Sequence, residues 1–188
     1  MINHIDLTGV LRRTVCDLYS DLVTRPTGAA VRDGIEKQLA ELGERSLTVI
    51  DFSHVRLLDY SCADEIVAKL LIRYAPADDE TEPPRDAYFV FRGVNEYHLD
   101  AIETVLERHG LAIVAERDAG EVDLIGAVGE AERRAWDALC RVGKLGAAGL
   151  ARELGITPDA AERVLERLRR RRLAMRLEEC WVAVGAAQ

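Results

Sequence analysis

Short apolar runs alternate with helical patterns over the first 129 residues of the chain. The run 47–52 is β-branched and almost entirely apolar, which is typical of a strand covered on both faces. Apolar residues recur at helical spacing from Val31 to Leu39, behind Thr27, which we expect to cap their helix. The whole pattern predicts strands at 17–24, 47–52, 88–92, 111–115 and 122–128, and helices at 28–42, 62–74 and 95–109. We therefore expect an α/β unit over residues 1–129, a mixed sheet with helices packed against it.

From residue 130 onward the pattern is helical and then ends in two short strands. Helical spacing predicts helices at 130–142, 147–154 and 159–172. The segment 173–184 has the pattern of a hairpin, with Glu178 and Glu179 at its tip. Three helices followed by a hairpin indicate a second, mainly α unit over residues 130–188.

Composition and charge agree with two folded units. The chain has 188 residues, of which 48% are hydrophobic and 31% charged, and this balance excludes a broadly disordered or collagen-like protein. The net charge of -8 is unevenly distributed, since residues 1–129 carry -11 and residues 130–188 carry +3. Such an asymmetry favours units with different partners.

A tight turn joins the two middle helices of the second unit. Gly155 stands where the backbone needs a positive φ, and Thr157 precedes a proline in the arrangement of a helix N-cap. The run Leu-Ala-x-x-Leu-Gly-Ile at 150–156 is followed by helically spaced apolar positions up to Leu168. With these motifs, residues 130–184 resemble the winged helix-turn-helix domain of bacterial transcription regulators.

This resemblance implies that the helix after Thr157 binds DNA, with its N-terminal residues in the major groove. The residues implied in DNA contacts are Thr157, Arg163, Arg167, Arg170 and Arg176. The arginine run 169–172 suits backbone phosphates, although it equally suits a solvated helix end that the helix dipole favours. Acidic residues at Asp159, Glu162 and the hairpin tip oppose phosphates, so a protein-binding role for this fold stays open.

The segment 49–65 carries a second motif. A buried strand runs into Asp-Phe-Ser-x-Val, and a hydrophobic pair followed by Asp-x-Ser then begins a helix. This motif resembles the signature of STAS domains, the fold of anti-sigma factor antagonists, and the order of strands and helices extends the likeness over residues 10–128. The resemblance implies that a partner kinase phosphorylates Ser61 beside Asp59, and that a regulatory protein docks on this face. A phosphate at a helix N-terminus would face free N–H groups and change the charge of the docking surface.

Two departures from that family leave another interpretation open. Tyr60 precedes the serine where the family usually has a small residue, and Cys62 follows it where a glycine is usual. In the second interpretation Ser61 only caps the helix, with Asp64 three residues later completing a pair like that of a capping box.

Few other kinds of chemistry are indicated. The four cysteines are Cys16, Cys62, Cys140 and Cys180. They are dispersed and form no C-x-x-C pair, so we expect neither a metal nor a redox site. We find no phosphate-binding loop and no catalytic constellation, and we expect no cofactor and no enzymatic activity. Arg25 beside a helix start is an alternative anion site, although an arginine is common there.

These expectations combine into one function. There is no apolar run of about 18 residues and no signal-peptide pattern, so we expect a cytoplasmic protein without a membrane partner. We expect a transcription regulator in which a STAS-like unit senses a protein partner and the winged helix binds double-stranded DNA, with a homodimer suited to two half-sites. The alternative is a protein–protein adaptor of the anti-sigma antagonist type that does not bind DNA.

Overall fold

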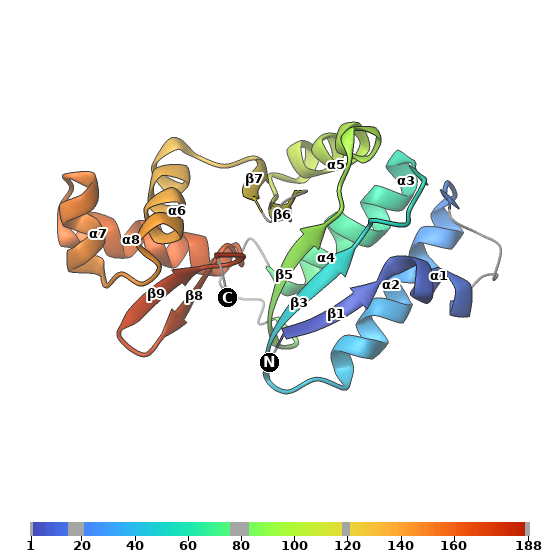
Figure 1. Ribbon diagram of the computed structural model, residues 1–188, viewed down its shortest axis with the longest axis horizontal. Helices are drawn as coiled ribbons and strands as arrows, with labels where there is room; N and C mark the ends of the chain where they lie inside the picture. Colours follow the sequence, from blue (N-terminus) through green and yellow to red (C-terminus); the bar gives the residue numbers. More distant parts are fainter. Residues whose placement is uncertain (1, 15–20, 76–82, 118–120, 187–188) are drawn as a thin grey trace.

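The computed structural model describes residues 2–14, 21–75, 83–117 and 121–186. Within these ranges the centre of the molecule is a five-stranded sheet in the order β1-β3-β5-β6-β7 (Figure 1). The strands are β1 Ile2–Asp6, β3 Arg45–Asp51, β5 Asp86–Arg92, β6 Ala112–Glu116 and β7 Val122–Gly126. The first four are parallel, and β7 is antiparallel to β6. The predicted mixed sheet with helices is therefore confirmed.

Helices cover one face of this sheet (Figure 1). They are α1 Leu7–Thr14, α2 Arg25–Ala40, α5 Glu96–His109, and one continuous helical segment made of α3 Tyr60–Ala63, the π-helical turn η1 Asp64–Ala68 and α4 Lys69–Tyr74. Their apolar faces pack with Ile50, Phe89 and Phe91 in one buried cluster. A short parallel ladder between β2 Asp21–Leu22 and β4 Leu57–Leu58 ties the start of α2 to the start of α3.

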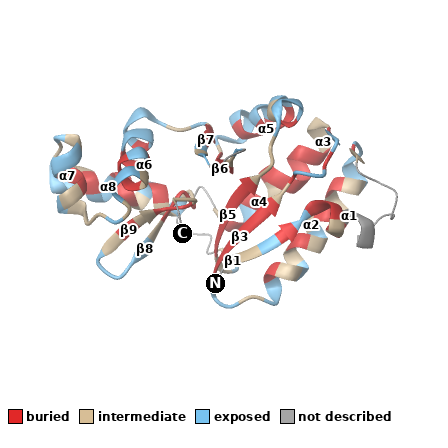
Figure 2. Cartoon of the chain, in the orientation of Figure 1, coloured by how far each residue is buried: buried red, intermediate tan, exposed pale blue. Residues whose placement is uncertain are grey.

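The C-terminal unit covers the opposite face of the sheet. It consists of α6 Glu130–Val142, α7 Ala147–Leu154, α8 Pro158–Arg170, β8 Ala174–Leu177 and β9 Cys180–Ala183. Alternate strand residues such as Val49 and Val114 share a second buried cluster with Leu168 and Trp181 of this unit (Figure 2). Beyond β9, Gly185 has a φ of 82°, and a Cβ atom there would lie only 2.8 Å from Val114 Cγ1. The chain thus follows the sheet surface closely, which only glycine permits at this point.

The arrangement explains why the second unit is needed. The helices described in the α/β unit lie on one face, so the other face would expose a row of apolar side chains to water. The C-terminal unit removes this face from water, and the two units therefore share a core. The three helices and the hairpin that the sequence predicts are present in the predicted order.

Several details differ from the predicted elements. The sequence pattern does not predict strand β1 or helix α1, and residues 17–20 of the expected first strand lie outside the described residues. Helix α2 begins at Arg25, and its cap is Thr24 rather than Thr27, which donates its backbone N–H to the Thr24 hydroxyl. The difference arises at Pro26, where the sequence pattern predicts the end of a strand. A proline is instead well tolerated in the first helical turn, because no N–H partner is required there.

Candidate functional site

The turn between α7 and α8 has the geometry that the sequence predicts. Gly155 has a φ of 66° and ends α7. Thr157 caps α8 by accepting a hydrogen bond of 3.2 Å from the backbone N–H of Ala160, and Pro158 is the first helical residue. The buried face of α8 contacts α6 and α7, so the other face of the helix is presented to solvent and to the α/β unit.

The residues expected to contact DNA are all exposed, but they differ in what they contact. Thr157 and Arg163 lie on the outer side of α8, and no described residue forms a hydrogen bond or ion pair with the Arg163 side chain. On β8, Arg176 stacks over the Trp181 ring at 5.6 Å and donates to a backbone carbonyl of the hairpin tip. These three residues are therefore spread over the start and middle of α8 and the hairpin.

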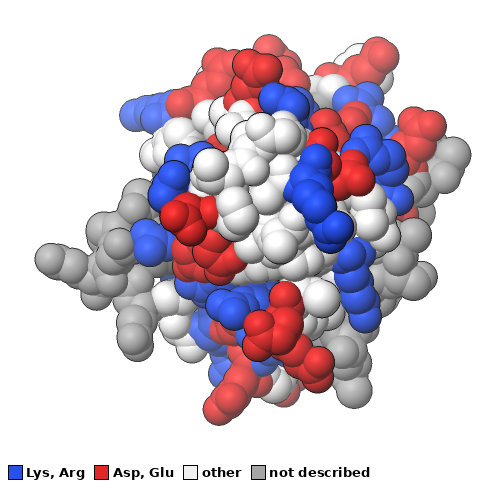
Figure 3. Space-filling model, turned by 90° about the vertical axis from the view of Figure 1, so that its left-hand side faces the viewer, with Lys and Arg blue, Asp and Glu red and all other residues white. Residues whose placement is uncertain are grey.

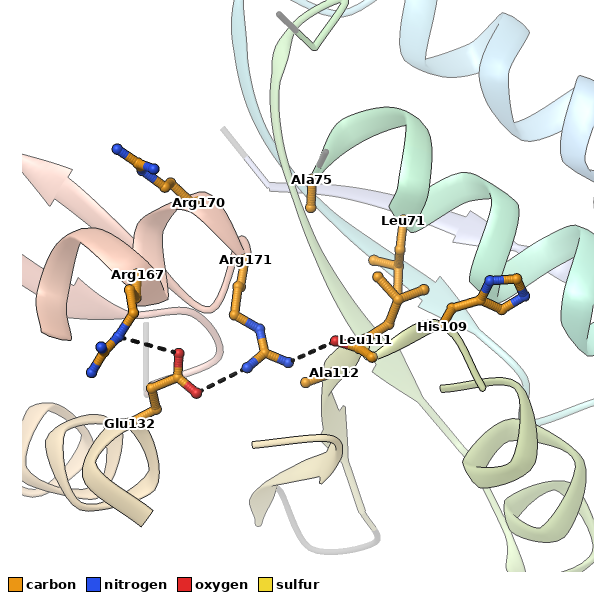
Figure 4. Close-up of a pocket in the computed structure, with 10 residues that line it drawn as sticks. Leu71, Ala75, His109, Leu111, Ala112, Glu132, Arg167, Arg170 and Arg171 are labelled. Atoms are coloured by element: carbon orange, nitrogen blue, oxygen red, sulfur yellow. Dashed lines mark hydrogen bonds and ion pairs between the residues drawn. The ribbon is translucent and has the colours of Figure 1, made fainter. Parts of the chain in front are cut away.

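Arg167 and Arg170 are ion-paired within the C-terminal unit instead. Arg167 Nε lies 3.8 Å from Oε1 of Glu132 on α6, and Arg170 Nε lies 3.5 Å from Glu166 Oε1. Both arginines line a cleft between the two units. Their position follows from α8 itself, whose C-terminal end approaches α4 and the turn between α5 and β6 (Figure 4).

Most of the arginine run 169–172 is engaged within the chain. Arg169 donates two hydrogen bonds to Glu166, of 2.9 and 3.0 Å from its Nε. Arg171 donates to Glu132 at 2.9 Å and to the backbone carbonyls of Gly110 and Ala127. Because both carbonyls belong to the α/β unit, Arg171 fastens α8 to it.

Arg172 is the residue that departs furthest from expectation. It is 7% exposed, its Nε donates to the Tyr74 carbonyl at 2.8 Å, and its guanidinium is ion-paired with Asp86. It also lies 5.1 Å from the centre of the Tyr88 ring. Arg172 therefore cannot contact DNA phosphates, and the idea of a wholly solvated helix end is wrong here as well.

The outer face of the C-terminal unit has mixed charge. Figure 3 shows this face with Lys and Arg side chains interspersed with Asp and Glu around a central area without charged side chains. Asp159 and Glu162 are exposed at the start of α8, and Glu178 and Glu179 are exposed at the hairpin tip. A nucleic acid would therefore meet separate basic side chains rather than one continuous basic surface.

The predicted phosphorylation site lies at the start of α3. Asp59, not Ser61, is the N-cap, because its carboxylate accepts the backbone N–H of Cys62 at 2.8 Å. The Ser61 hydroxyl is half-buried and donates to the same carboxylate at 2.9 Å. The Asp59 carboxylate and the Ser61 hydroxyl are therefore in direct contact. Burial raises the pKa of the neighbouring Cys62 thiol to about 12, so this cysteine stays a thiol.

A cluster of buried charges follows on the π-helical turn. Asp64 and Glu65 each accept a hydrogen bond from Arg25, at 2.8 and 2.7 Å. His109 contacts Asp64 at 3.1 Å, and Lys69 forms an ion pair with Glu65. Burial acts to raise the pKa of both carboxyls, but these partners hold each pKa below its ordinary value. Arg25 is thus engaged by carboxylates, which removes the basis for an anion site at the start of α2.

A cleft of about 350 Å³ lies between α8 and the α/β unit, and we call it the junction cleft. Arg167, Arg170 and Arg171 line it on one side, and Leu71, Ala75 and Leu111 are among the residues opposite (Figure 4). Sequence analysis does not predict this cleft, since its two sides come from segments 56 to 100 positions apart. The arginine run 169–172 was the only sequence feature that pointed to this region, and a run of arginines does not indicate which part of the fold packs against it.

Other kinds of site have no support in the described part of the chain. No group of three or more metal-ligating side chains is found among the described residues. No helix in those residues is long and apolar enough to cross a membrane. Comparisons with family models, with curated proteins and with solved structures find no match to this chain.

Proposed function

We propose that this chain is a DNA-binding transcription regulator in which the α/β unit controls the position of α8. The observation that carries the proposal is the way in which α8 is held. The outer face of its N-terminal half, with Thr157 and Arg163, is exposed, whereas its C-terminal end is anchored to the α/β unit by Arg171 and Arg172. A helix presented in this manner suits the recognition helix of a winged helix-turn-helix domain.

The same anchor connects α8 with the Ser61 turn. The continuous helical segment 60–74 begins at this turn and ends at Tyr74, whose carbonyl accepts the Arg172 hydrogen bond. The segment contains a π-helical turn, a feature that is frequent at functional sites. Binding of a partner, or phosphorylation, at Ser61 would therefore act on one end of a helix that holds α8 at the other end.

The experiment is a titration of fluorescently labelled random-sequence duplex DNA with the full chain, followed by anisotropy at several salt concentrations. We expect affinity to fall steeply with salt, and each of Arg163→Ala and Arg176→Ala to reduce the slope of log K against log salt by about 1. Lys37→Ala is the matched control, because Lys37 is an exposed cation on α2, in the layer on the far side of the sheet. Absence of DNA binding at low salt, or an equal loss in the Lys37 variant, would contradict the proposal.

The adaptor remains the second candidate because of the acidic hairpin tip. Glu178 and Glu179 are exposed where a DNA-binding wing approaches phosphates, and they would repel them. The double variant Glu178→Gln, Glu179→Gln separates the two functions. A regulator should bind DNA more tightly after this change, whereas an adaptor should show no DNA affinity in either form.

A further inference from the structure

The β8–β9 hairpin carries apolar side chains on both of its faces. On the inner face Trp181 and Ala183 are buried in the cluster shared with the sheet. Side chains alternate along each strand, and those on the outer face are also apolar: Met175, Leu177, Cys180 and Val182. We call these four residues the outer hairpin face. A hairpin with one face in water usually alternates apolar and polar residues, so this face differs from an ordinary solvent-exposed one.

The four side chains form one contiguous patch. The strand register places Met175 opposite Val182, and Leu177 opposite Cys180. A groove of about 340 Å³ lies along this face, with Met175, Leu177 and Val182 among the residues that line it. Leu177 is 38% exposed. A contiguous apolar patch on the surface is typical of a site that binds another protein.

The charged side chains at the two ends of the outer hairpin face differ in sign. Lys144 precedes the bridge between Leu145 and Trp181, and it lines the groove. Glu178 and Glu179 form the hairpin tip at the other end, where both are exposed. No described residue forms an ion pair with the side chain of Lys144 or of either glutamate. The face therefore runs from a cation at one end to an acidic tip at the other.

Neighbouring arginines do not reverse this pattern. Arg176 lies on the inner face, where it stacks over the Trp181 ring at 5.6 Å and donates to the Glu178 backbone carbonyl. Even with Arg176 counted, two carboxylates against one guanidinium leave the tip acidic. Arg45, which donates to the Arg176 carbonyl, is itself ion-paired with Asp86.

An apolar patch between a cation and an acidic tip is complementary to a second copy of itself. In an isologous dimer the same patch of both copies meets across a two-fold axis, so each contact occurs twice. An axis that lies in the plane of the outer hairpin face and runs across the strands reverses the strand direction. Lys144 of each copy then lies over the acidic tip of the other, and Leu177 lies over Met175 and Val182.

We propose that the outer hairpin face is the interface of a homodimer. Its apolar side chains pack against those of the second copy, and Lys144 of each copy pairs with Glu179 of the other. A patch of four side chains and a two-residue tip buries less than the roughly 1,200 Å² of a stable interface, so the dimer is weak, with a Kd of about 10–100 µM. This interface does not depend on whether α8 binds DNA.

The test is sedimentation equilibrium of the full chain without DNA, at total concentrations of about 1–300 µM that span this Kd. We expect the mean molar mass to rise from that of one chain toward that of two. A chain that stays monomeric over this range would leave the outer hairpin face to a partner of another kind and overturn the proposal. Growth beyond two copies would also overturn it, because an isologous contact closes at two.

Charge reversal tests the pairing of the two ends. Lys144→Glu, and separately Glu178→Lys with Glu179→Lys, should each weaken the homodimer by about tenfold or more, because like charges then meet at both ends. An equimolar mixture of the two proteins should recover association, since each supplies the charge that the other lacks. A mixture that stays monomeric where the parent chain dimerises contradicts the proposed pairing.

Leu177→Glu tests the apolar contact, and it should abolish dimerisation over the same concentration range. Tyr97→Glu is the matched control, because Tyr97 is 80% exposed on α5 of the other unit, and it should change the Kd less than about twofold. Unchanged far-UV circular dichroism and urea midpoints, both measured well below the Kd, show that each variant is folded. Full dimerisation of Leu177→Glu, or an equal loss in Tyr97→Glu, refutes the interface.

Discussion

Replacing Arg172 by leucine tests how the two units are held together. Arg172 connects the end of α8 with Tyr74 and Asp86, residues that lie 98 and 86 positions earlier in the chain. Its φ of 61° is in the left-handed region, and leucine carries a similar backbone cost there, so the substitution leaves that strain unchanged. The change in stability therefore reports the side-chain contacts.

The expected loss follows from those contacts. Breaking a buried ion pair by removing one partner costs about 3–5 kcal/mol, because the remaining charge is left uncompensated. Here Asp86 keeps Arg45, whose Nε lies 2.5 Å from its other oxygen, but the Tyr74 carbonyl loses its contact with Arg172. We therefore expect the lower end, about 3 kcal/mol, which corresponds to a fall in Tm of about 6–12 °C for a chain of this size.

The assay is urea unfolding near neutral pH. Burial acts to raise the pKa of Asp86, but Arg45 and Arg172 hold that pKa below its ordinary value. The stabilisation that comes from the lowered Asp86 pKa is present at pH values above the pKa of the unfolded chain, about 3.9. It is lost as the pH falls through the lower pKa of the folded chain, so it is fully present at neutral pH. Trp136 and Trp181 are both buried in the C-terminal unit, and their fluorescence reports its undocking while circular dichroism reports the whole fold.

A double-mutant cycle and a control make the result decisive. Arg172→Leu combined with Asp86→Asn should show a coupling energy of at least about 1 kcal/mol, as residues in contact do. Arg163→Leu, at an exposed position on α8 before this turn, should stay within about 0.5 kcal/mol of the parent. An Arg172→Leu protein that is also within about 0.5 kcal/mol of the parent, with no coupling to Asp86, refutes the anchoring role.

Further predictions concern the core, the cap, pH and the shared sheet face. Gly28→Ala should lower the free energy of unfolding by about 1–3 kcal/mol in urea titrations, because the added Cβ atom would lie 2.9 Å from the Cα of Cys62 on α3. An unchanged urea midpoint would mean that α2 shifts to accommodate the methyl group. Asp59→Ala should lower the free energy of unfolding by about 1 kcal/mol in the same titration, because α3 loses its N-cap. An equal loss in Ser61→Ala would contradict the assignment of the cap to Asp59. Burial lowers the pKa of His98 in the folded chain, so as the pH drops below about 6.5 this histidine takes up a proton more readily in the unfolded chain, and stability should fall. Urea midpoints measured at several pH values should therefore depend less on pH in His98→Gln than in the parent. The same pH dependence in both proteins would contradict this role of His98. Residues 1–129 expressed alone should self-associate in sedimentation experiments, since their apolar sheet face loses its cover, whereas a well-folded monomer would mean that this face tolerates water.

Much of the candidate site depended on contacts that no local pattern contains. The cap at Thr157 and the positive φ of Gly155 were predictable, because both are decided by the few residues of the turn itself. The cap of α3 was assigned to the wrong residue, since Asp59 and Ser61 are both good capping residues and only the helix start distinguishes them. Strand β1 was missed because a lone edge strand of five residues is recognised by its pairing with β3 rather than by its own pattern.

The amino-acid sequence by itself determined the order of most strands and helices, the turn between α7 and α8 and the change of charge near residue 130, because periodicity, caps and composition act over a few residues. Only the tertiary structure decided how the two units meet. In the sequence Arg170 and Arg172 are equivalent members of one basic run. In the structure Arg170 is half exposed, whereas Arg172 is buried between the C-terminal unit and the α/β unit. The difference arises because α8 ends where it reaches the face of the sheet that the other helices leave open. Without Arg172, the Tyr74 carbonyl would lose its hydrogen bond from that side chain and Asp86 would keep only Arg45 of its two arginine partners.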